Sequence, residues 1–415
     1  MSSLRGYLSG PREAMLTQAM AKRMTLDFLK TESASGLILA TAALAAIVLA
    51  NSPWAQAYFG FIHQAFTIEF GAFTETLPVG DWVKDGLMAI FFFVVGLEIK
   101  YEILKGELAN PRRLALPVIA ALGGVLGPAL IYLAVNMGPG ARPEGWPVPM
   151  ATDIAFAIAA LAVAGPKLPP NLRVFLLTLA IVDDLGAVGL IGLLFTHHFR
   201  IMELLGAGLA LIGMGLLGRW RKAPYLFYLV GFVIVWGFTL KSGVSTSLAG
   251  VAAAATIPLE PRKAGRPGVL EDFMEGLHPY VAFLILPLFA FTAAGFTFRH
   301  LGLSDLFGPL ALGVAAGLFF GKQIGVFGAS ALVIGLKLAR RPTGATWVEL
   351  YGLSLLCGLG FTMSLFIGQL AFPLSDAAAQ AQVRIGVVVG SLLSTAAGMA
   401  VLAWAQRRRE REDAD

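Results

Sequence analysis

Long apolar runs alternate with short polar loops along nearly the whole chain. Twelve runs approach the roughly 20 residues that a helix needs to cross a bilayer core, although several are short. They lie near residues 35–51, 82–104, 114–135, 147–164, 172–196, 202–218, 223–240, 243–257, 278–298, 306–336, 346–371 and 379–405. The pattern predicts an all-α polytopic membrane protein with twelve transmembrane helices.

The two ends of the chain have a different pattern. Residues 11–31 mix charged and apolar positions at helical spacing, which predicts an amphipathic helix on the membrane surface. We therefore expect an amphipathic cytoplasmic segment over residues 1–32, without a cleavable signal peptide. The membrane domain follows over 33–405, and residues 406–415 form a charged cytoplasmic tail.

Residues 61–80 alternate apolar and polar positions around Gly71. Alternation with a period of two, interrupted by glycine, favours a β-hairpin, which we place on the outer face. An ordinary irregular loop is the alternative.

Composition and charge agree with a membrane protein. The chain is 57% hydrophobic and 14% charged. Soluble domains contain about 25% charged residues. With both ends inside, 24 of the 31 lysines and arginines fall on the cytoplasmic side and 6 on the outer side. The net charge of +5 therefore indicates topology and not nucleic-acid binding. The one cysteine, Cys357, lies in an apolar segment and is expected to pack there.

Asp183 and Asp184 are adjacent within the apolar run 174–195. Ionised carboxylates in hydrocarbon cost several kcal/mol or more, so intramembrane acids usually serve a function. Helical neighbours point about 100° apart, so one acid can face an aqueous funnel and the other a neighbouring helix. We expect a site where a cation and protons compete. A buried structural pair is the alternative.

A second polar pair, Thr152 and Asp153, follows Pro147 and Pro149. The prolines remove backbone donors, so this span is expected to be broken into two half-helices. Hydroxyl, carboxylate and free carbonyl oxygens there could bind a hard cation, and Asp153 could also cap the second half-helix. The glycine-rich segment 357–366 is a second candidate break. Its alternative is a seam of small residues between helices.

Lys322 lies in the middle of the run 306–336, too far from either end to reach water. Such a lysine needs an acidic partner or a helix C-terminus, and Asp183 is the natural candidate. A tolerated interfacial lysine is the alternative. Glu98 and Asp85 lie at the ends of the second span, where charges are usually solvated, and Glu98 could mark a funnel mouth. His278 is expected at an interface. No metal-site spacing and no phosphate-binding loop occur, so we expect neither a cofactor nor enzymatic activity.

Seven strings together carry a family resemblance. They are DGLMAIFFFVVGLEIKYE, GWPVPMATDIAFA, LAIVDDLGA, LKSGVSTSLAGV, LHPYVAFLILPLFAF, GKQIG and GLGFTMSLF. In this order they resemble the NhaA-type bacterial sodium/proton antiporters over most of residues 30–400. The resemblance implies inverted repeats formed by spans three to five and ten to twelve, with broken helices four and eleven crossing near mid-membrane.

The resemblance also implies residue roles. Asp183 and Asp184 match the paired aspartates that bind the transported Na⁺ and protons. Thr152 and Asp153 match the break in helix four, and Lys322 matches the intramembrane lysine that partners the first aspartate.

Further positions match the funnel or the pH-responsive region, namely Asp85, Glu98 and His278. Ser245 departs from the family, because a histidine linked to pH response usually stands there. The hairpin at 61–80 matches the family's dimerisation element.

The implied activity is electrogenic, pH-regulated antiport of Na⁺ or Li⁺ against H⁺ by a homodimer in the bacterial inner membrane. The alternative is a sodium-coupled symporter for an organic anion on the same fold, against which Lys322 argues. A cation channel or a sensor is a third class, which the compact acidic cluster does not favour.

Overall fold

The computed structural model describes most of the chain. The described residues are 34–71, 73–109, 111–195, 200–220, 223–259, 268–298, 307–373 and 375–412. The predicted amphipathic helix over 11–31, with the rest of segment 1–32, lies outside them.

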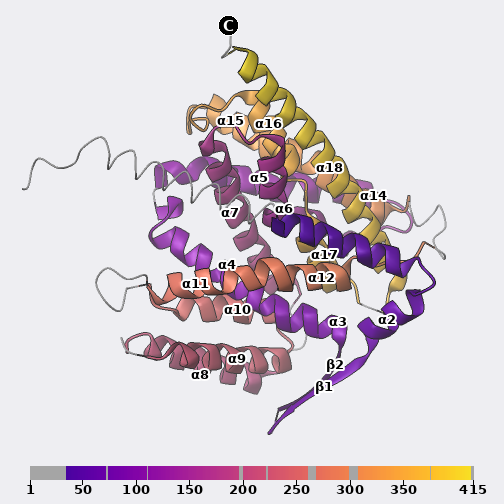
Figure 1. Cartoon of the computed structure of the whole chain (residues 1–415), viewed down its shortest axis with the longest axis vertical. Helices are drawn as coiled ribbons and strands as arrows, with labels where there is room; N and C mark the ends of the chain where they lie inside the picture. Colours follow the sequence, from indigo (N-terminus) through magenta and orange to yellow (C-terminus); the bar gives the residue numbers. More distant parts are fainter. Residues whose placement is uncertain are drawn as a thin grey trace, which may run out of the picture.

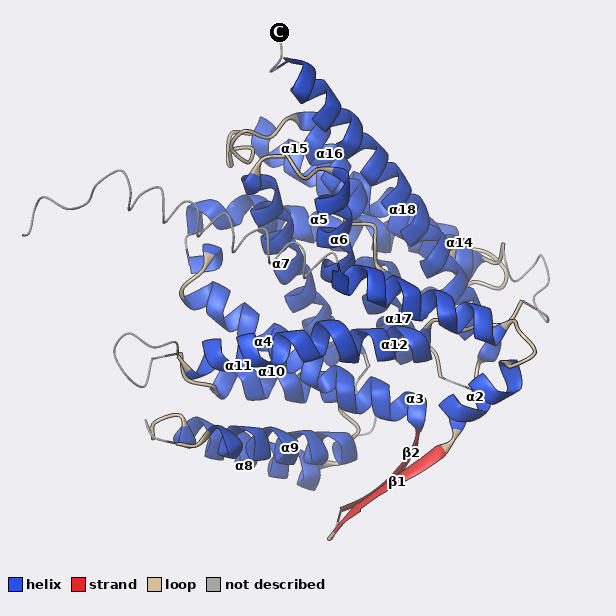
Figure 2. Ribbon diagram, in the orientation of Figure 1, coloured by secondary structure: helices blue, strands red, loops and turns tan. Residues whose placement is uncertain are grey.

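The described chain is almost entirely helical, with one two-stranded sheet (Figure 2). The helices are Ala34–Ala50, α2 (Ala55–His63), α3 (Val79–Asp81), α4 (Met88–Leu104), α5 (Pro111–Val135), α6 (Ile154–Ala164), α7 (Pro170–Leu194), α8 (Ile201–Leu217), α9 (Tyr225–Ser242), α10 (Thr246–Thr256), α11 (Val269–Tyr280), α12 (Leu286–Ala293), α14 (Pro309–Ala316), α15 (Gly328–Gly335), α16 (Trp347–Leu356), α17 (Phe361–Ala371) and α18 (Ala377–Glu412). Wider π-helical turns cover Trp82–Leu87, Val281–Ile285, Gly317–Gly321 and Gln323–Phe327. Short 3₁₀ turns cover Glu107–Ala109, Pro143–Gly145 and Val148–Met150.

The lengths and apolar character of these helices fit a multi-pass membrane protein. Among the described residues, six helices are long and apolar enough to cross a bilayer, or nine if each bent pair is one span. The predicted sixth and eighth spans form the shorter apolar helices α8 and α10. Twelve crossings stay a prediction.

Both predicted helix breaks are present. The segment Pro143–Met150 meets α6 at 46°, and α16 meets α17 at 43°. Residues 151–153 and 357–360 separate the half-helices, where the prolines and glycines of the sequence placed the breaks.

The predicted hairpin is also present, so the irregular-loop alternative is wrong. Strand β1 (Ala65–Phe70) runs antiparallel to β2 (Phe73–Pro78), with Phe66 opposite Leu77. The φ angle of Gly71 is 60° and positive. Glycine adopts this conformation without steric cost at a tight turn. The ribbon projects away from the helices (Figure 1).

The helices form two groups, seen as the lower and upper halves of Figure 1. The lower group contains α2–α4 and α8–α12, in which α4 packs along α10 and α8 along α9. The upper group contains α5–α7 and α14–α18, in which α18 packs on α14 and α16. The two groups meet along α4, α7, α12 and α17. Asp184, on α7, lies at this boundary.

Candidate cation-binding site

A buried ion pair lies at the middle of the upper group. The Lys322 Nζ donates to Asp183 Oδ2 across 2.9 Å, and the lysine is 0% and the aspartate 2% exposed. The Thr152 backbone N–H donates to the same carboxylate oxygen at 2.8 Å. The predicted partnership of Lys322 with Asp183 is confirmed.

A glycine seam brings Lys322 into position. Glycines of α5 face glycines around Lys322 so closely that a Cβ added to Gly325 would lie 2.0 Å from the Gly123 carbonyl oxygen. A Cβ added to Gly124 would be 3.6 Å from Lys322 Nζ. Small residues allow such close backbone approach within membranes. The wide π-helical turns on both sides of Lys322 are a feature often found at functional sites.

The two helix breaks bind one another. The Asp153 N–H donates to the Leu359 carbonyl oxygen at 2.7 Å, and Thr152 Oγ1 donates to the Cys357 carbonyl oxygen at 2.9 Å. Asp153 Oδ1 caps α6 by accepting from the Phe156 N–H at 3.2 Å. These bonds satisfy backbone groups that the breaks would otherwise leave unpaired in an apolar environment.

Asp153 also reaches across to α17. Its Oδ2 accepts from the Thr362 N–H at 3.0 Å and from the Thr362 hydroxyl. The capping role and a place at the crossing are therefore combined in one side chain. Thr362 was not singled out from sequence; its signal was its position just after the glycine-rich break.

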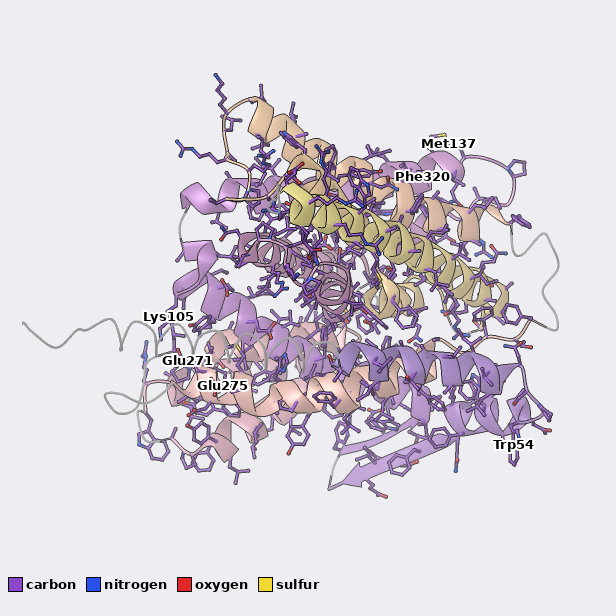
Figure 3. The ribbon with its side chains drawn as sticks, turned by 45° about the horizontal axis from the view of Figure 1, so that its top comes forward. Trp54, Lys105, Met137, Glu271, Glu275 and Phe320 are labelled. Carbon is purple, nitrogen blue, oxygen red and sulfur yellow. The ribbon has the colours of Figure 1, made fainter. Side chains whose placement is uncertain are left out.

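Asp184 points in a different direction from Asp183, as the helical spacing predicted. It is 2% exposed and lines a cavity of about 490 Å³ at the boundary between the two helix groups. The acidic residues around this cavity are Glu98, Glu102, Asp153, Asp184 and Glu275, and His278 lines it too. Glu275 is exposed at one end of the molecule, far from Trp54 at the other (Figure 3). We name this space the acidic cavity. Its negative lining raises the local concentration of cations.

One carboxylate of the site has a buried oxygen without a donor among the described residues, and another faces the acidic cavity. Asp183 Oδ1 is buried and has no hydrogen-bond partner within the described chain. The Asp184 side chain lines the acidic cavity. Buried polar atoms are normally satisfied, so oxygens left open in this way are available to a proton or a cation.

The structure divides the four residues predicted for the funnel or the pH response. Glu98 and His278 line the acidic cavity with Asp184. Asp85 lies at the opposite end of the second span, where Lys84 Nζ is 3.4 Å from its carboxylate. Ser245 is near this second place, because it begins α10, which packs against the Trp82–Leu87 turn that contains Asp85. Asp85 and Ser245 are therefore not part of the acidic cavity.

Comparison with known proteins agrees with the site. The family model described as Na⁺/H⁺ antiporter 1 matches residues 26–402. The chain is 47% identical to the Na(+)/H(+) antiporter NhaA 1 of Syntrophotalea carbinolica, over 92% of this chain and 96% of that protein. It is 49% identical to the Na(+)/H(+) antiporter NhaA of Nitrobacter hamburgensis, over 91% and 90%. It is 47% identical to that of Caulobacter vibrioides, over 95% and 94%. The chain thus belongs to the Na⁺/H⁺ antiporter 1 family.

Proposed function

We propose that this protein exchanges Na⁺ or Li⁺ for H⁺ across the bacterial inner membrane as a secondary transporter. The observation that carries the proposal is the Asp183–Lys322 ion pair, buried directly beside Asp184 at the end of an acidic cavity. Membership in the antiporter family supports the same activity.

Competition at the carboxylates makes the exchange obligatory. In the cation-loaded state, Asp184 and Asp153 supply oxygens to a dehydrated Na⁺, with the Thr362 hydroxyl within the same cluster. Oxygen donors suit such hard cations. In the other state, protons neutralise the acids, and close acids titrate as a coupled set. One occupancy therefore displaces the other.

Lys322 links this competition to Asp183. While paired, its ammonium holds Asp183 ionised without a cation. When Na⁺ approaches, the positive charge of the ion weakens that pair by repulsion, which frees Asp183 to become a ligand and Lys322 to release a proton. A sodium-coupled symporter has no need of such a lysine–acid switch, so this geometry does not favour it.

Movement of one helix group against the other gives access to alternate sides. The acidic cavity opens on the boundary between the groups at the Glu275 end. At the other end the boundary is closed by the buried rings of Phe92, Phe289 and Phe366. The ring centroid of Phe366 is 5.2 Å from that of Phe92 and 6.0 Å from that of Phe289. The three rings must separate for release on that side. This rocking fits a twelve-helix inverted-repeat fold in which Pro111–Leu194 and Pro309–Glu412 are the repeats.

Further features belong to the same proposal. Both termini are cytoplasmic, so the Glu275 end faces the cytoplasm and the hairpin faces outward, where it joins two copies into a homodimer. Export of sodium into an alkaline medium requires the membrane potential, worth about 2.3 kcal/mol per charge per 100 mV. More protons than sodium ions then enter in each cycle, so transport is electrogenic.

A vesicle assay tests the activity. Everted membrane vesicles containing the protein are given a pH gradient, and Na⁺, Li⁺ or K⁺ is added in turn. We expect Na⁺ or Li⁺ to collapse the gradient, Asp184→Asn to abolish this response, and Glu410→Gln, in the exposed tail, to preserve it. Normal sodium-dependent proton exchange by Asp184→Asn would refute the assignment.

The same assay tests pH regulation. Repeating it between about pH 6.5 and 9 with Ser245→His asks whether the residue at the start of α10 sets the pH response. We expect the histidine variant to be activated over a narrower pH range than the native chain. Identical profiles would remove position 245 from the regulatory proposal.

A further inference from the structure

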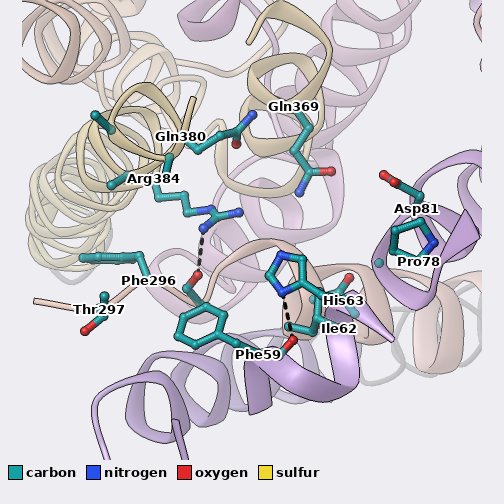
Figure 4. A pocket seen from close by; sticks show the side chains of 16 residues that line it. Phe59, Ile62, His63, Pro78, Asp81, Phe296, Thr297, Gln369, Gln380 and Arg384 are labelled. Atoms are coloured by element: carbon teal, nitrogen blue, oxygen red, sulfur yellow. Dashed lines mark hydrogen bonds between the residues drawn. The ribbon is translucent and has the colours of Figure 1, made fainter. Parts of the chain in front are cut away.

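A second cavity, of about 410 Å³, lies at the opposite end of the boundary between the helix groups (Figure 4). Its walls come from α2 and the end of α12 in the lower group, and from α17 and the start of α18 in the upper group. Along α12 and α17, the buried Phe289 and Phe366 stand between the residues that line this cavity and those that line the acidic cavity. This outer cavity is therefore separate from the cation site.

Arg384 is the main charged group of the outer cavity. Its Nη1 donates to the Gly295 carbonyl oxygen at 3.0 Å, drawn as a dashed line in Figure 4. Its Nε is buried and has no hydrogen-bond partner in the described part of the chain. No acidic side chain of the described residues pairs with it. For comparison, Arg142 pairs with Asp376 at 2.9 Å.

An arginine in this state needs an anion. Guanidinium does not lose its proton in proteins, so the charge persists. Arg384 is half-buried, and a charge partly removed from water without a counter-ion is unfavourable. Among the described residues, the one carboxylate that lines the cavity is Asp81, which pairs with Lys84 at 2.8 Å and not with Arg384. The edge of Arg384 that carries Nε is left to a ligand.

The rest of the lining indicates what kind of anion fits. Apolar side chains including Phe59, Ile62 and Phe296 make most of the wall, and Gln369 adds an amide on the same side as Arg384 (Figure 4). Such a wall favours a ligand with an apolar portion beside its charge. A simple ion such as chloride would leave the apolar wall unused.

The position of the cavity indicates where the ligand comes from. Helix α2 forms one wall, and Trp54 just before it and Phe61 within it are 69% and 52% exposed. Exposed aromatic residues gather where a membrane protein meets the headgroup region. The cavity is therefore at the depth of phospholipid headgroups.

We propose that the outer cavity binds the glycerophosphate headgroup of an anionic phospholipid, with the free edge of Arg384 on the phosphate. Arginine binds phosphate through two parallel N–H donors, which matches that edge. Because its walls belong to both helix groups, a bound headgroup ties them together at this end. The lipid then keeps the rings of Phe92, Phe289 and Phe366, which form an aromatic barrier, in contact and so regulates the exchange. Binding itself does not depend on the antiport proposal.

Lipid titration of the full-length protein in detergent, read by native mass spectrometry, tests this. We expect saturable binding of phosphatidylglycerol and none of phosphatidylcholine at the same concentration. Loss of charge-assisted bonds in Arg384→Gln should weaken that binding by at least about tenfold. Arg142→Gln, which removes an outer arginine that is paired with an acid, should bind as the native chain does.

Two further arms keep the test decisive. Ala381→Leu fills the cavity and leaves Arg384 intact, so it should reduce binding even if Arg384→Gln fails to fold. Soluble glycerol 3-phosphate tests whether the phosphate comes from a lipid or from a free ligand. Competition by this compound would support a phosphate site whose occupant is a free ligand. Native-like phosphatidylglycerol binding by both cavity variants, or equal binding of the two lipids, would overturn the proposal.

Discussion

Replacing Lys322 by glutamine tests the energetics at the centre of the site. The substitution keeps the approximate length of the side chain and removes its charge. The Lys322 Nζ and the Asp183 carboxylate are 2.9 Å apart. At that separation their attraction is roughly 6 kcal/mol for an effective dielectric constant of about 20. Breaking one partner of a buried pair costs about 3–5 kcal/mol, because the other charge stays buried. We expect Lys322→Gln to destabilise the protein by about 4 kcal/mol near pH 8.

The assay is thermal unfolding of the purified protein in one detergent, with the double variant Asp183→Asn/Lys322→Gln beside the single ones. Removing both charges leaves no uncompensated ion, so the double variant should regain about 2 kcal/mol over the sum of the single losses. The deficit of Lys322→Gln should also shrink in acid, since protonation neutralises the isolated carboxylate. Lys105→Gln is the control, because its ion pair with Glu271 is partly exposed. Such a surface pair is worth less than about 1 kcal/mol.

Two results would refute this reasoning. Additive losses in the double variant would show that Lys322 and Asp183 are energetically independent. An unchanged unfolding temperature for Lys322→Gln would show that the lysine is not obligatorily paired.

The remaining predictions concern helix packing. Gly325→Ala should lower both stability and antiport, because its Cβ would meet backbone 2.0 Å away. A Cβ added at Gly328 has no neighbour within 4 Å, so Gly328→Ala should be neutral or stabilising. Equal unfolding temperatures for the two variants would contradict the close glycine packing between α5 and the helix around Lys322. Arg409 donates to the buried Glu349 at 2.8 Å. Arg409→Gln leaves that carboxylate buried without its counter-charge and should lower the free energy of unfolding by about 2 kcal/mol. This is below the full value for a buried pair because the arginine is partly exposed. Arg408→Gln, in an exposed pair, should cost under about 1 kcal/mol, and equal losses in denaturation would contradict this difference. Phe366→Ala should raise sodium-independent proton leak in the vesicle assay by weakening the aromatic barrier, and an unchanged leak would place the barrier elsewhere.

Features with a local physical cause were predictable from sequence. Prolines before Thr152 and glycines after Cys357 locate the breaks, because they change the backbone where they stand. The alternation around Gly71 predicted the hairpin for the same reason. Lys322 could be matched to Asp183 over a long sequence distance only because few charges lie within apolar runs.

Features that depend on packing between distant segments were not predictable. The bond from Thr362 to Asp153 exists because two broken helices cross, and one sequence does not reveal which of many threonines is at the crossing. The separation of Asp85 from Glu98 follows from the length of their shared span, yet both were assigned to one funnel or pH-response set. Arg384 looked like an ordinary outer basic residue, since nothing local shows that its neighbours lack an acid.

Proton release on sodium binding tests the central claim most directly. Purified native protein in weakly buffered solution near pH 8 receives NaCl, and the change in pH is followed beside the heat of binding. Competition at Asp183 and Asp184 predicts that Na⁺ binding releases protons, and that Asp184→Asn shows neither release nor binding. Sodium binding by the native protein without proton release would contradict the account.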